Sequence, residues 1–151
     1  MPAVVIRNAM LADLPSVLAL YADDALALRR PGDDTTVYAD AFADIESDPR
    51  TAVYVATHDG VVVGTFQATV LRHLLARVMH VESVHVHSRE RGRGVGTEMM
   101  RWALEDARAK GCTRVELTSQ KRRVDAHRFY EKLGFVRSTA QRTNTPAMRV
   151  R

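Results

Sequence analysis

Six residues near the middle of the chain combine glycine with arginine in a way that suits phosphate binding. Residues 91–96 read Arg-Gly-Arg-Gly-Val-Gly, and they separate a strand-like segment (81–87) from a helix-like one (97–110). Glycine lets the backbone come close to a ligand, and the first N–H groups of the following helix lack helical partners, so an anion can accept from them. Arginine adds fixed charge and paired donors. The segment therefore predicts an anion-binding loop.

Histidines just before this loop raise the alternative of a metal site. His85 and His87 are two positions apart on the expected strand, so their side chains would share one face. By the same alternation His80 falls out of phase with them, and no third ligand is evident. We therefore expect no metal site, and His85 and His87 are kept as candidate bases.

Composition places the chain among soluble proteins of one domain. The 151 residues are 46% hydrophobic and 26% charged, so we expect a single domain with its own core over residues 1–151. The apolar runs are far shorter than the ~20 residues of a membrane helix, and the start lacks a signal-peptide pattern. We expect a cytoplasmic protein with no membrane partner. The single Cys112 excludes an internal disulfide and a cysteine-based zinc cluster.

The net charge of +4 conceals a division along the chain. Among the charged residues of 13–48 the acidic ones dominate, whereas arginines and lysines dominate from Arg89 onward. One interpretation is a cationic ligand near the first part and an anionic ligand near the second. The other is that these charges only solvate helix faces. The acidic residues concerned are Asp23, Asp24, Asp33, Asp34, Asp40, Asp44 and Glu46.

The hydrophobic pattern predicts one continuous α/β unit in the order β-α-α-β-β-β-α-β-α-β-β. Asp59-Gly60 between two β-branched runs indicates a hairpin, and Asp13 followed by Leu14-Pro15 indicates a helix start. Gly111 and Gly134 are each placed to end a helix. Strands are expected at 4–6, 51–57, 61–70, 78–87, 115–118, 135–136 and 148–150, and helices after 13 and at 37–45, 97–110 and 125–133.

Two segments around the loop carry a resemblance to a known family. Residues 84–87 (Val-His-Val-His) precede it, and residues 126–135 (Ala-His-Arg-Phe-Tyr-Glu-Lys-Leu-Gly-Phe) follow it about thirty positions later. With the R-x-x-G-x-G pattern at 91–96, they are similar to the two core motifs of the GNAT superfamily of acetyl-CoA-dependent N-acetyltransferases. The resemblance covers the whole element order. It implies an α/β (α+β) fold with a mixed, mostly antiparallel central sheet of about seven strands flanked by about four helices.

The resemblance implies acetyl-CoA as co-substrate and no metal. Backbone N–H groups of the loop would hold the pyrophosphate, with arginines at the rim. The strand edge before the loop would hydrogen-bond the pantetheine arm, as an added strand does. The implied cofactor-binding residues are Val84, His85, Val86, Arg91, Gly92, Arg93, Gly94, Val95, Gly96, Thr97, Ser119, Arg123, His127 and Tyr130.

One position departs from the family pattern. The asparagine that often stands three residues before the second motif is here Arg123, so its polar contact with the cofactor falls to Ser119 or Asp125. The nucleotide phosphate also needs a cation. Four basic residues are candidates for it, namely Arg89, Lys121, Arg122 and Arg123.

Acetyl transfer to an amine needs a proton acceptor and a proton donor. An alkyl amine has a pKa near ~10.4, so a base or a water path must deprotonate it at neutral pH. By resemblance Glu82 is the base, directly or through water, with His85 and His87 as alternatives. Tyr130 matches the family tyrosine that protonates the leaving thiolate, and the N–H of Val86 would meet the oxyanion. The alternative for Glu82 is surface pairing with an arginine, and for Tyr130 it is core packing.

The acceptor is the partner that the sequence defines least. By resemblance it enters over residues 22–38, where acidic residues suit a small or cationic primary amine. Tyr21, Tyr38 and Phe42 would form an apolar wall there, or serve only as helix core. A protein or peptide acceptor stays open, and so does a homodimer, because dimers are common in the family.

Two other classes of function are weighed against the enzyme. A non-catalytic acetyl-CoA sensor would not need the acid and base that Tyr130 and Glu82 offer. A nucleic-acid-binding protein would fit the isoelectric point of about 9.6, but no aromatic residues interleave with the arginines. We therefore expect an enzyme with no nucleic-acid partner.

Overall fold

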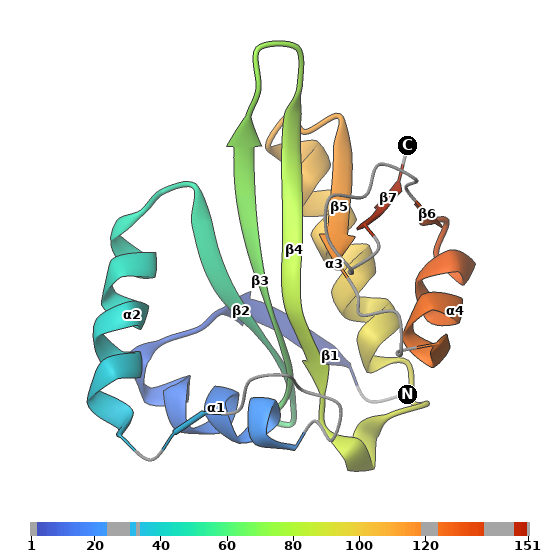
Figure 1. The fold of residues 1–151 in the computed structure, drawn as a ribbon. Helices are drawn as coiled ribbons and strands as arrows, with labels where there is room; N and C mark the ends of the chain where they lie inside the picture. The colour runs from blue at the N-terminus through green and yellow to red at the C-terminus, as the bar shows by residue number, and fades with distance from the viewer. Residues whose placement is uncertain (1–2, 24–30, 33, 119–123, 138–146, 151) are drawn as a thin grey trace.

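The computed structural model describes residues 3–23, 31–32, 34–118, 124–137 and 147–150. Within these residues a seven-stranded sheet carries α1 and α2 on one face and α3 and α4 on the other (Figure 1). The strands are β1 (Val4–Asn8), β2 (Thr51–His58), β3 (Val61–Arg72), β4 (Arg77–Val86), β5 (Arg114–Thr118), β6 (Val136–Arg137) and β7 (Ala147–Val150). The helices are α1 (Leu14–Ala22), α2 (Thr35–Ser47), α3 (Val95–Ala109) and α4 (Val124–Lys132), with short 3-10 turns η1 (Leu11–Asp13) and η2 (Ser88–Glu90).

The strands lie in the order β1-β2-β3-β4-β5-β7-β6. Only β4 and β5 are parallel among the described pairs, and every other pair is antiparallel. A parallel pair needs a long connection, and α3 supplies it by crossing the sheet between β4 and β5. The expected mixed, mostly antiparallel α/β fold is confirmed.

The hairpin between β2 and β3 is confirmed at the predicted turn. Asp59 and Gly60 both have positive φ, 50° and 76°, and His58 pairs with Val61 across the turn. Two successive left-handed residues match the right-handed twist of the flanking strands, and Asp-Gly is a sequence that accepts this conformation. The turn follows directly from the local sequence.

Two helices begin earlier than the hydrophobic pattern predicts, and both have a cap that explains it. The Asp34 carboxylate accepts from the Thr36 N–H at 3.1 Å, so α2 starts two residues before Val37. Gly94 has φ 88° and occupies the N-cap of α3, so Val95 and Gly96 lie within the first helical turn.

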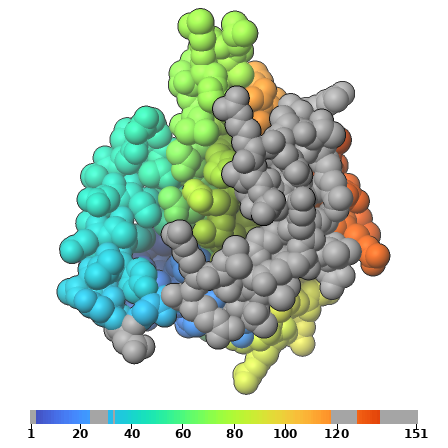
Figure 2. Space-filling view, viewed as in Figure 1, coloured from blue at the N-terminus to red at the C-terminus, as the bar shows by residue number. Residues whose placement is uncertain are grey.

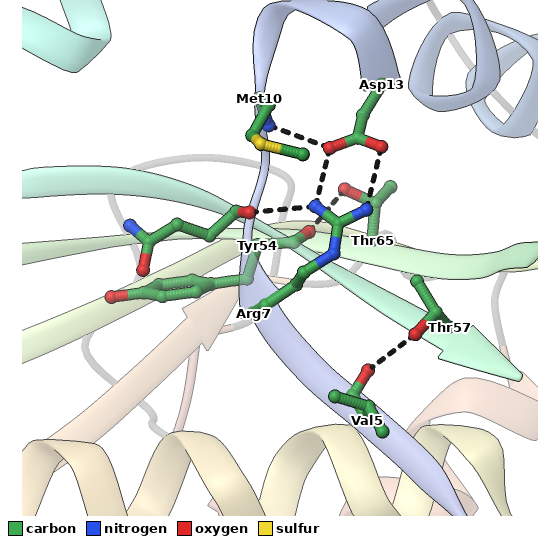
Figure 3. Close-up of polar contacts among 8 residues, drawn as sticks. Val5, Arg7, Met10, Asp13, Tyr54, Thr57 and Thr65 are labelled. Carbon is green, nitrogen blue, oxygen red and sulfur yellow. Dashed lines mark hydrogen bonds and ion pairs between the residues drawn. The ribbon is translucent and has the colours of Figure 1, made fainter. Parts of the chain in front are cut away.

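Asp13 occupies the predicted N-cap position of α1, but its carboxylate makes no capping hydrogen bond. It accepts instead from both terminal nitrogens of Arg7, at 2.7 and 2.9 Å, and from the Met10 N–H at 2.7 Å (Figure 3). The predicted start of α1 is confirmed. The Asp13 side chain does not cap the helix, because it binds Arg7 of β1 instead. The contact ties α1 to the sheet edge.

The core has one cluster on each face of the sheet. On the α3 side, Met99 and Met100 pack with Phe66, Met79 and further buried residues from the central strands. On the other side, Val17 of α1 and Phe42 of α2 pack on β2. None of the described helices has the length and apolar character needed to cross a bilayer.

Candidate active site

The central strands separate where the family resemblance places the cofactor. Residues 78–81 of β4 pair with residues 114–117 of β5, and the register stops at Val81 and Leu117. β4 continues to Val86, still paired with β3. Among the described residues, no strand pairs with the β5-facing edge of β4 beyond Val81. A strand edge that has no strand partner can bind an extended ligand.

A bulge in β4 decides which side chains face which side of the sheet. Gln67 of β3 pairs with Glu82, but two residues earlier on β3 Thr65 pairs with His85, so β4 holds one extra residue here. The extra residue is Ser83, whose φ is 54°, a left-handed value that is uncommon outside glycine. Before Ser83 the even-numbered side chains face one side of the sheet, and after it the odd-numbered ones face that side.

The bulge corrects the prediction that His80 is out of phase with His85. His80, Glu82 and His85 oppose Thr69, Gln67 and Thr65, which are spaced by two along β3 and share one face. The three β4 side chains consequently lie on the α1 and α2 side. Even so, the described residues hold no group of three or more His, Cys, Asp or Glu placed to bind a metal ion.

Tyr21 of α1 meets this face of β4. Its ring lies 4.8 Å from the His85 ring, centroid to centroid, at an interplanar angle of 48°. Burial raises the pKa of the Tyr21 phenol, a hydrogen bond with the Ser83 side chain opposes that shift, and the charge of Glu82 adds to it. Tyr21 thus contacts His85 just beyond the bulge, and its pKa is affected by the charge of Glu82 just before it.

The backbone of β4 presents different residues to its two edges. The N–H of His87 donates to the Val63 carbonyl of β3 at 2.9 Å. Because these directions alternate along a strand, Val84 and Val86 direct their N–H and C=O groups to the opposite edge, toward β5. The Arg91 Nε donates to the Val86 carbonyl there at 3.3 Å.

The three glycines of the loop have different structural roles. Gly92 has φ 76° with open space where a Cβ would lie, and Gly94 has φ 88° as the α3 N-cap. Gly96 is in the helix, and a Cβ on it would lie 3.1 Å from the Phe129 ring. The first two allow turns that other residues resist, and the third allows α4 to pack closely on α3.

The remaining loop side chains divide between core and solvent. Val95 is buried and Thr97 is half-buried, whereas Arg91 and Arg93 are exposed. Arg93 lies 3.8 Å from the Glu90 carboxylate. The open face of the loop therefore consists mainly of backbone and guanidinium groups, which suits an anion.

Tyr130 lies on the other side of the sheet from Glu82. It is buried, with 7% of its surface exposed, between Phe129 and Phe135 at centroid distances of 5.2 and 5.8 Å. Val84 and Val86 pack against the cluster that contains it. Four sequence candidates, Ser119, Lys121, Arg122 and Arg123, lie outside the described residues. So does the side chain of His127, whose backbone belongs to α4.

A cavity of about 550 Å³, including its open mouth, lies between α1, α2 and the sheet. Tyr21, Tyr38 and Phe42, the aromatic residues noted in the sequence, all line it. Gln67 of β3 also lines it, and this contact was not predicted, because only the strand register places Gln67 opposite Glu82. A polar residue within a β-branched run was the only available signal.

None of the acidic residues of the first third that the structure describes lines this cavity. Asp23, which follows α1, accepts from the backbone N–H of Ser88 at 2.8 Å and from its hydroxyl at 3.2 Å. These bonds lower the pKa of the Asp23 carboxyl, the backbone bond most of all. Asp34 caps α2, and Asp24 and Asp33 lie outside the described residues.

A family model for the acetyltransferase (GNAT) family matches residues 15–135. The chain belongs to the GNAT family. It is an acetyl-CoA-dependent N-acetyltransferase, as the sequence resemblance implied. The match includes β4, the glycine loop, α3 and α4 and ends at Phe135.

Relatives of known sequence and structure agree with this assignment. The aminoalkylphosphonate N-acetyltransferase of Salmonella typhimurium is 31% identical over 140 residues, 91% of this chain and 88% of the relative. A crystal structure described as a transcriptional regulator from Bacillus halodurans is 34% identical, with a TM-score of 0.85 over 93% of this chain and 97% of that one. The PaiA N-acetyltransferase of Thermoplasma acidophilum, solved with coenzyme A, shares the fold at 11% identity, with a TM-score of 0.80 over 99% of each chain.

Proposed function

We propose that this N-acetyltransferase acetylates a small primary amine by direct transfer from acetyl-CoA, in the gap between β4 and β5. One observation carries the proposal. Beyond Val81 the β4 edge is free of strand pairing among the described residues, with Tyr130 on one side of β4 and Glu82 and His85 on the other. A thioester in this gap is approached from one face and releases its sulfur toward the other.

Acetyl-CoA, when bound, supplies the activated acetyl group. Val84 would hydrogen-bond the pantetheine arm through its backbone groups. The Val86 carbonyl, which accepts from the Arg91 Nε at 3.3 Å, would have to exchange that partner to bind the arm as well. The N–H groups of residues 92–97 would hold the pyrophosphate, with Arg91 and Arg93 adding charge. For His85 the geometry favours a role toward the acceptor, because its backbone pairs with Thr65 and its ring faces Tyr21.

The reaction moves one proton on each side of β4. The amine nitrogen loses a proton to Glu82, directly or through water, and its lone pair attacks the carbonyl carbon. The N–H of Val86 would donate to the oxyanion. The C–S bond then breaks, and the Tyr130 phenol protonates the thiolate. A phenol has an ordinary pKa of ~10, so at pH 7 it carries the proton that this step needs.

The relatives support a small acceptor over a protein. The Salmonella relative acts on aminoalkylphosphonates, and a rice relative, 40% identical over 65 residues, is a glucosamine 6-phosphate N-acetyltransferase. That second match covers 43% of this chain and 38% of the relative. The cavity is also lined mainly by apolar side chains with a few polar groups, as small-ligand sites usually are.

Thiol release from acetyl-CoA across a panel of small amines tests the proposal. Tyr130→Phe keeps the ring and removes the acidic hydrogen, so kcat should fall about 100-fold while the Kd for coenzyme A stays within about threefold. Glu82→Gln should lower kcat in the same assay. Tyr54→Phe is the matched control, because Tyr54 is also buried, lies on β2 and binds Lys110 at 3.1 Å. A Tyr130→Phe enzyme as active as the control would refute the acid.

A further inference from the structure

The cavity between α1, α2 and the sheet is apolar over most of its described lining. Its walls come from both helices and from β2 and β3, and include Leu18, Phe42 and Ile45. The polar atoms available are the Tyr21 and Tyr38 hydroxyls and the Gln67 amide. The Tyr38 hydroxyl accepts from the Gly32 N–H at 2.6 Å, and the Gln67 Nε2 donates to the Thr51 hydroxyl at 3.2 Å. Tyr38 and Gln67 therefore each already have one hydrogen-bond partner within the protein.

The described lining of the cavity contains no carboxylate. Two acids near the cavity have other partners, since Asp13 binds Arg7 and Asp23 binds Ser88. Glu46 lines the adjoining pocket beside Phe42 and Ile45 and does not line this cavity. An ammonium group placed among apolar side chains without a counter-charge is strongly disfavoured. A polyamine would have to place a second ammonium group in such a wall, so the lining favours an acceptor with a single charged nitrogen.

Tyr21 connects the cavity to the reacting end of the site. It lines the cavity, and the same side chain contacts His85 and hydrogen-bonds Ser83 beside Glu82. Gln67 makes the second connection, because it lines the cavity and pairs with Glu82. A molecule whose body fills the cavity therefore has its outer end at the bulge of β4.

We propose that the acceptor is a primary monoamine with a compact alkyl or aryl body. The body occupies the cavity between α1, α2 and the sheet, and the amino group lies past Tyr21, beside Glu82 and His85. This inference rests on the proposed function, since it names the substrate class of the same site. It differs from the cationic acceptor that the acidic first third of the sequence suggests.

A series of straight-chain amines measures the proposed contact. Each methylene that enters an apolar cavity should raise kcat/KM about fourfold, so ethylamine to hexylamine should form a rising series until the cavity is full. Spermidine and 2-aminoethylphosphonate serve as polycationic and anionic competitors, read by thiol release at fixed acetyl-CoA. A flat series, or either competitor exceeding hexylamine, would overturn the proposal. No thiol release with any amine, despite coenzyme A binding, would instead sink the proposed function.

Two alanines on α2 provide a matched pair of variants. Ala41 and Ala43 are both exposed, and only Ala41 lines the cavity. Ala41→Phe should reduce the rise in kcat/KM from ethylamine to hexylamine at least tenfold, because the phenyl ring fills the cavity. Ala43→Phe should keep the full rise. If both variants flatten it, or neither does, the cavity does not hold the acceptor body.

Discussion

At the scale of single residues, side chains that look like ligand-binding groups in the sequence are often engaged by local partners. Asp13 is the clearest case, because its carboxylate accepts three hydrogen bonds and only 8% of the residue is exposed. The Arg7 guanidinium lowers the pKa of the Asp13 carboxyl below its ordinary value of 3.8, against the opposing effect of burial. The contact joins β1 to α1 and has a structural role.

The lowered pKa of Asp13 predicts how the stability contribution depends on pH. A carboxyl whose pKa is depressed in the folded state stabilises the fold above its unfolded pKa and loses that contribution as the pH falls through the folded value. Asp13→Asn should cost about 1–2 kcal/mol of unfolding free energy at pH 7, at the lower end for a charged hydrogen bond because Arg7 is 35% exposed.

Urea unfolding at pH 7 and at successively lower pH measures this difference. The difference in unfolding free energy between the wild type and Asp13→Asn should shrink once the pH falls below about 3.8, the ordinary pKa, and continue to shrink through the depressed pKa. Asp40→Asn, at an exposed position of α2, should leave the unfolding free energy unchanged at both extremes. A cost for Asp13→Asn that is the same at every pH would mean that the carboxylate charge is irrelevant.

At the scale of elements, the glycine loop and the β4 bulge are both built from left-handed residues. Gly92 and Gly94 turn the chain from β4 into α3, and Ser83 changes which side chains of β4 face each side of the sheet. The loop brings free N–H groups to one end of the β4–β5 gap, and the bulge brings Glu82 and His85 to the cavity side. The site is thus formed by two local irregularities in otherwise regular elements.

Two glycines with the same backbone angle separate conformational strain from ligand binding. Gly60 and Gly92 both have φ 76°, and a Cβ on either would meet open space. Gly60→Ala and Gly92→Ala should each lower stability by about 1 kcal/mol, because alanine resists this conformation. Only Gly92→Ala should weaken coenzyme A binding, by about tenfold or ~1.4 kcal/mol, as measured by calorimetry. Equal affinities in the two variants would argue against the loop as the pyrophosphate site.

At the scale of the whole molecule, α3 packs on the sheet through a contact between residues that are far apart in the chain. A Cβ on Gly64 of β3 would lie 2.6 Å from the Met99 Sδ of α3 and 3.3 Å from the His85 carbonyl. The helix that follows the glycine loop therefore packs on the strand beside β4.

The β3–β4 hairpin extends beyond the rest of the described residues (Figures 1 and 2).

A double-mutant cycle tests the contact between Gly64 and Met99. Gly64→Ala should cost about 1–3 kcal/mol through overpacking, and Met99→Ala about 2–5 kcal/mol through the cavity it leaves. The double variant should cost at least about 1 kcal/mol less than the sum, because the added methyl enters the vacated space. Urea unfolding gives all three values. Additive costs would show that α3 and β3 do not compete for this volume.

Much of the fold, including the conformation of the glycine loop, is readable from the sequence because it depends on residues close together in the chain. The Asp59-Gly60 turn, the glycine loop before α3, and the helix ends at Gly111 and Gly134 each follow from a few neighbouring residues. The two motifs around the loop were sufficient to identify the family and acetyl-CoA. Backbone conformation at a glycine and the start of a helix are local properties.

The acceptor side of the site was decided only by tertiary structure. Simple alternation separates His80 from His85, and one extra residue at Ser83 reverses that relation through the pairing of β3 with β4. The partners of Asp13 and Asp23, and the apolar lining beside Gln67, likewise come from elements distant in the sequence. Strand register and helix packing are set by contacts between distant segments, and the residues on either side of a position carry no record of them.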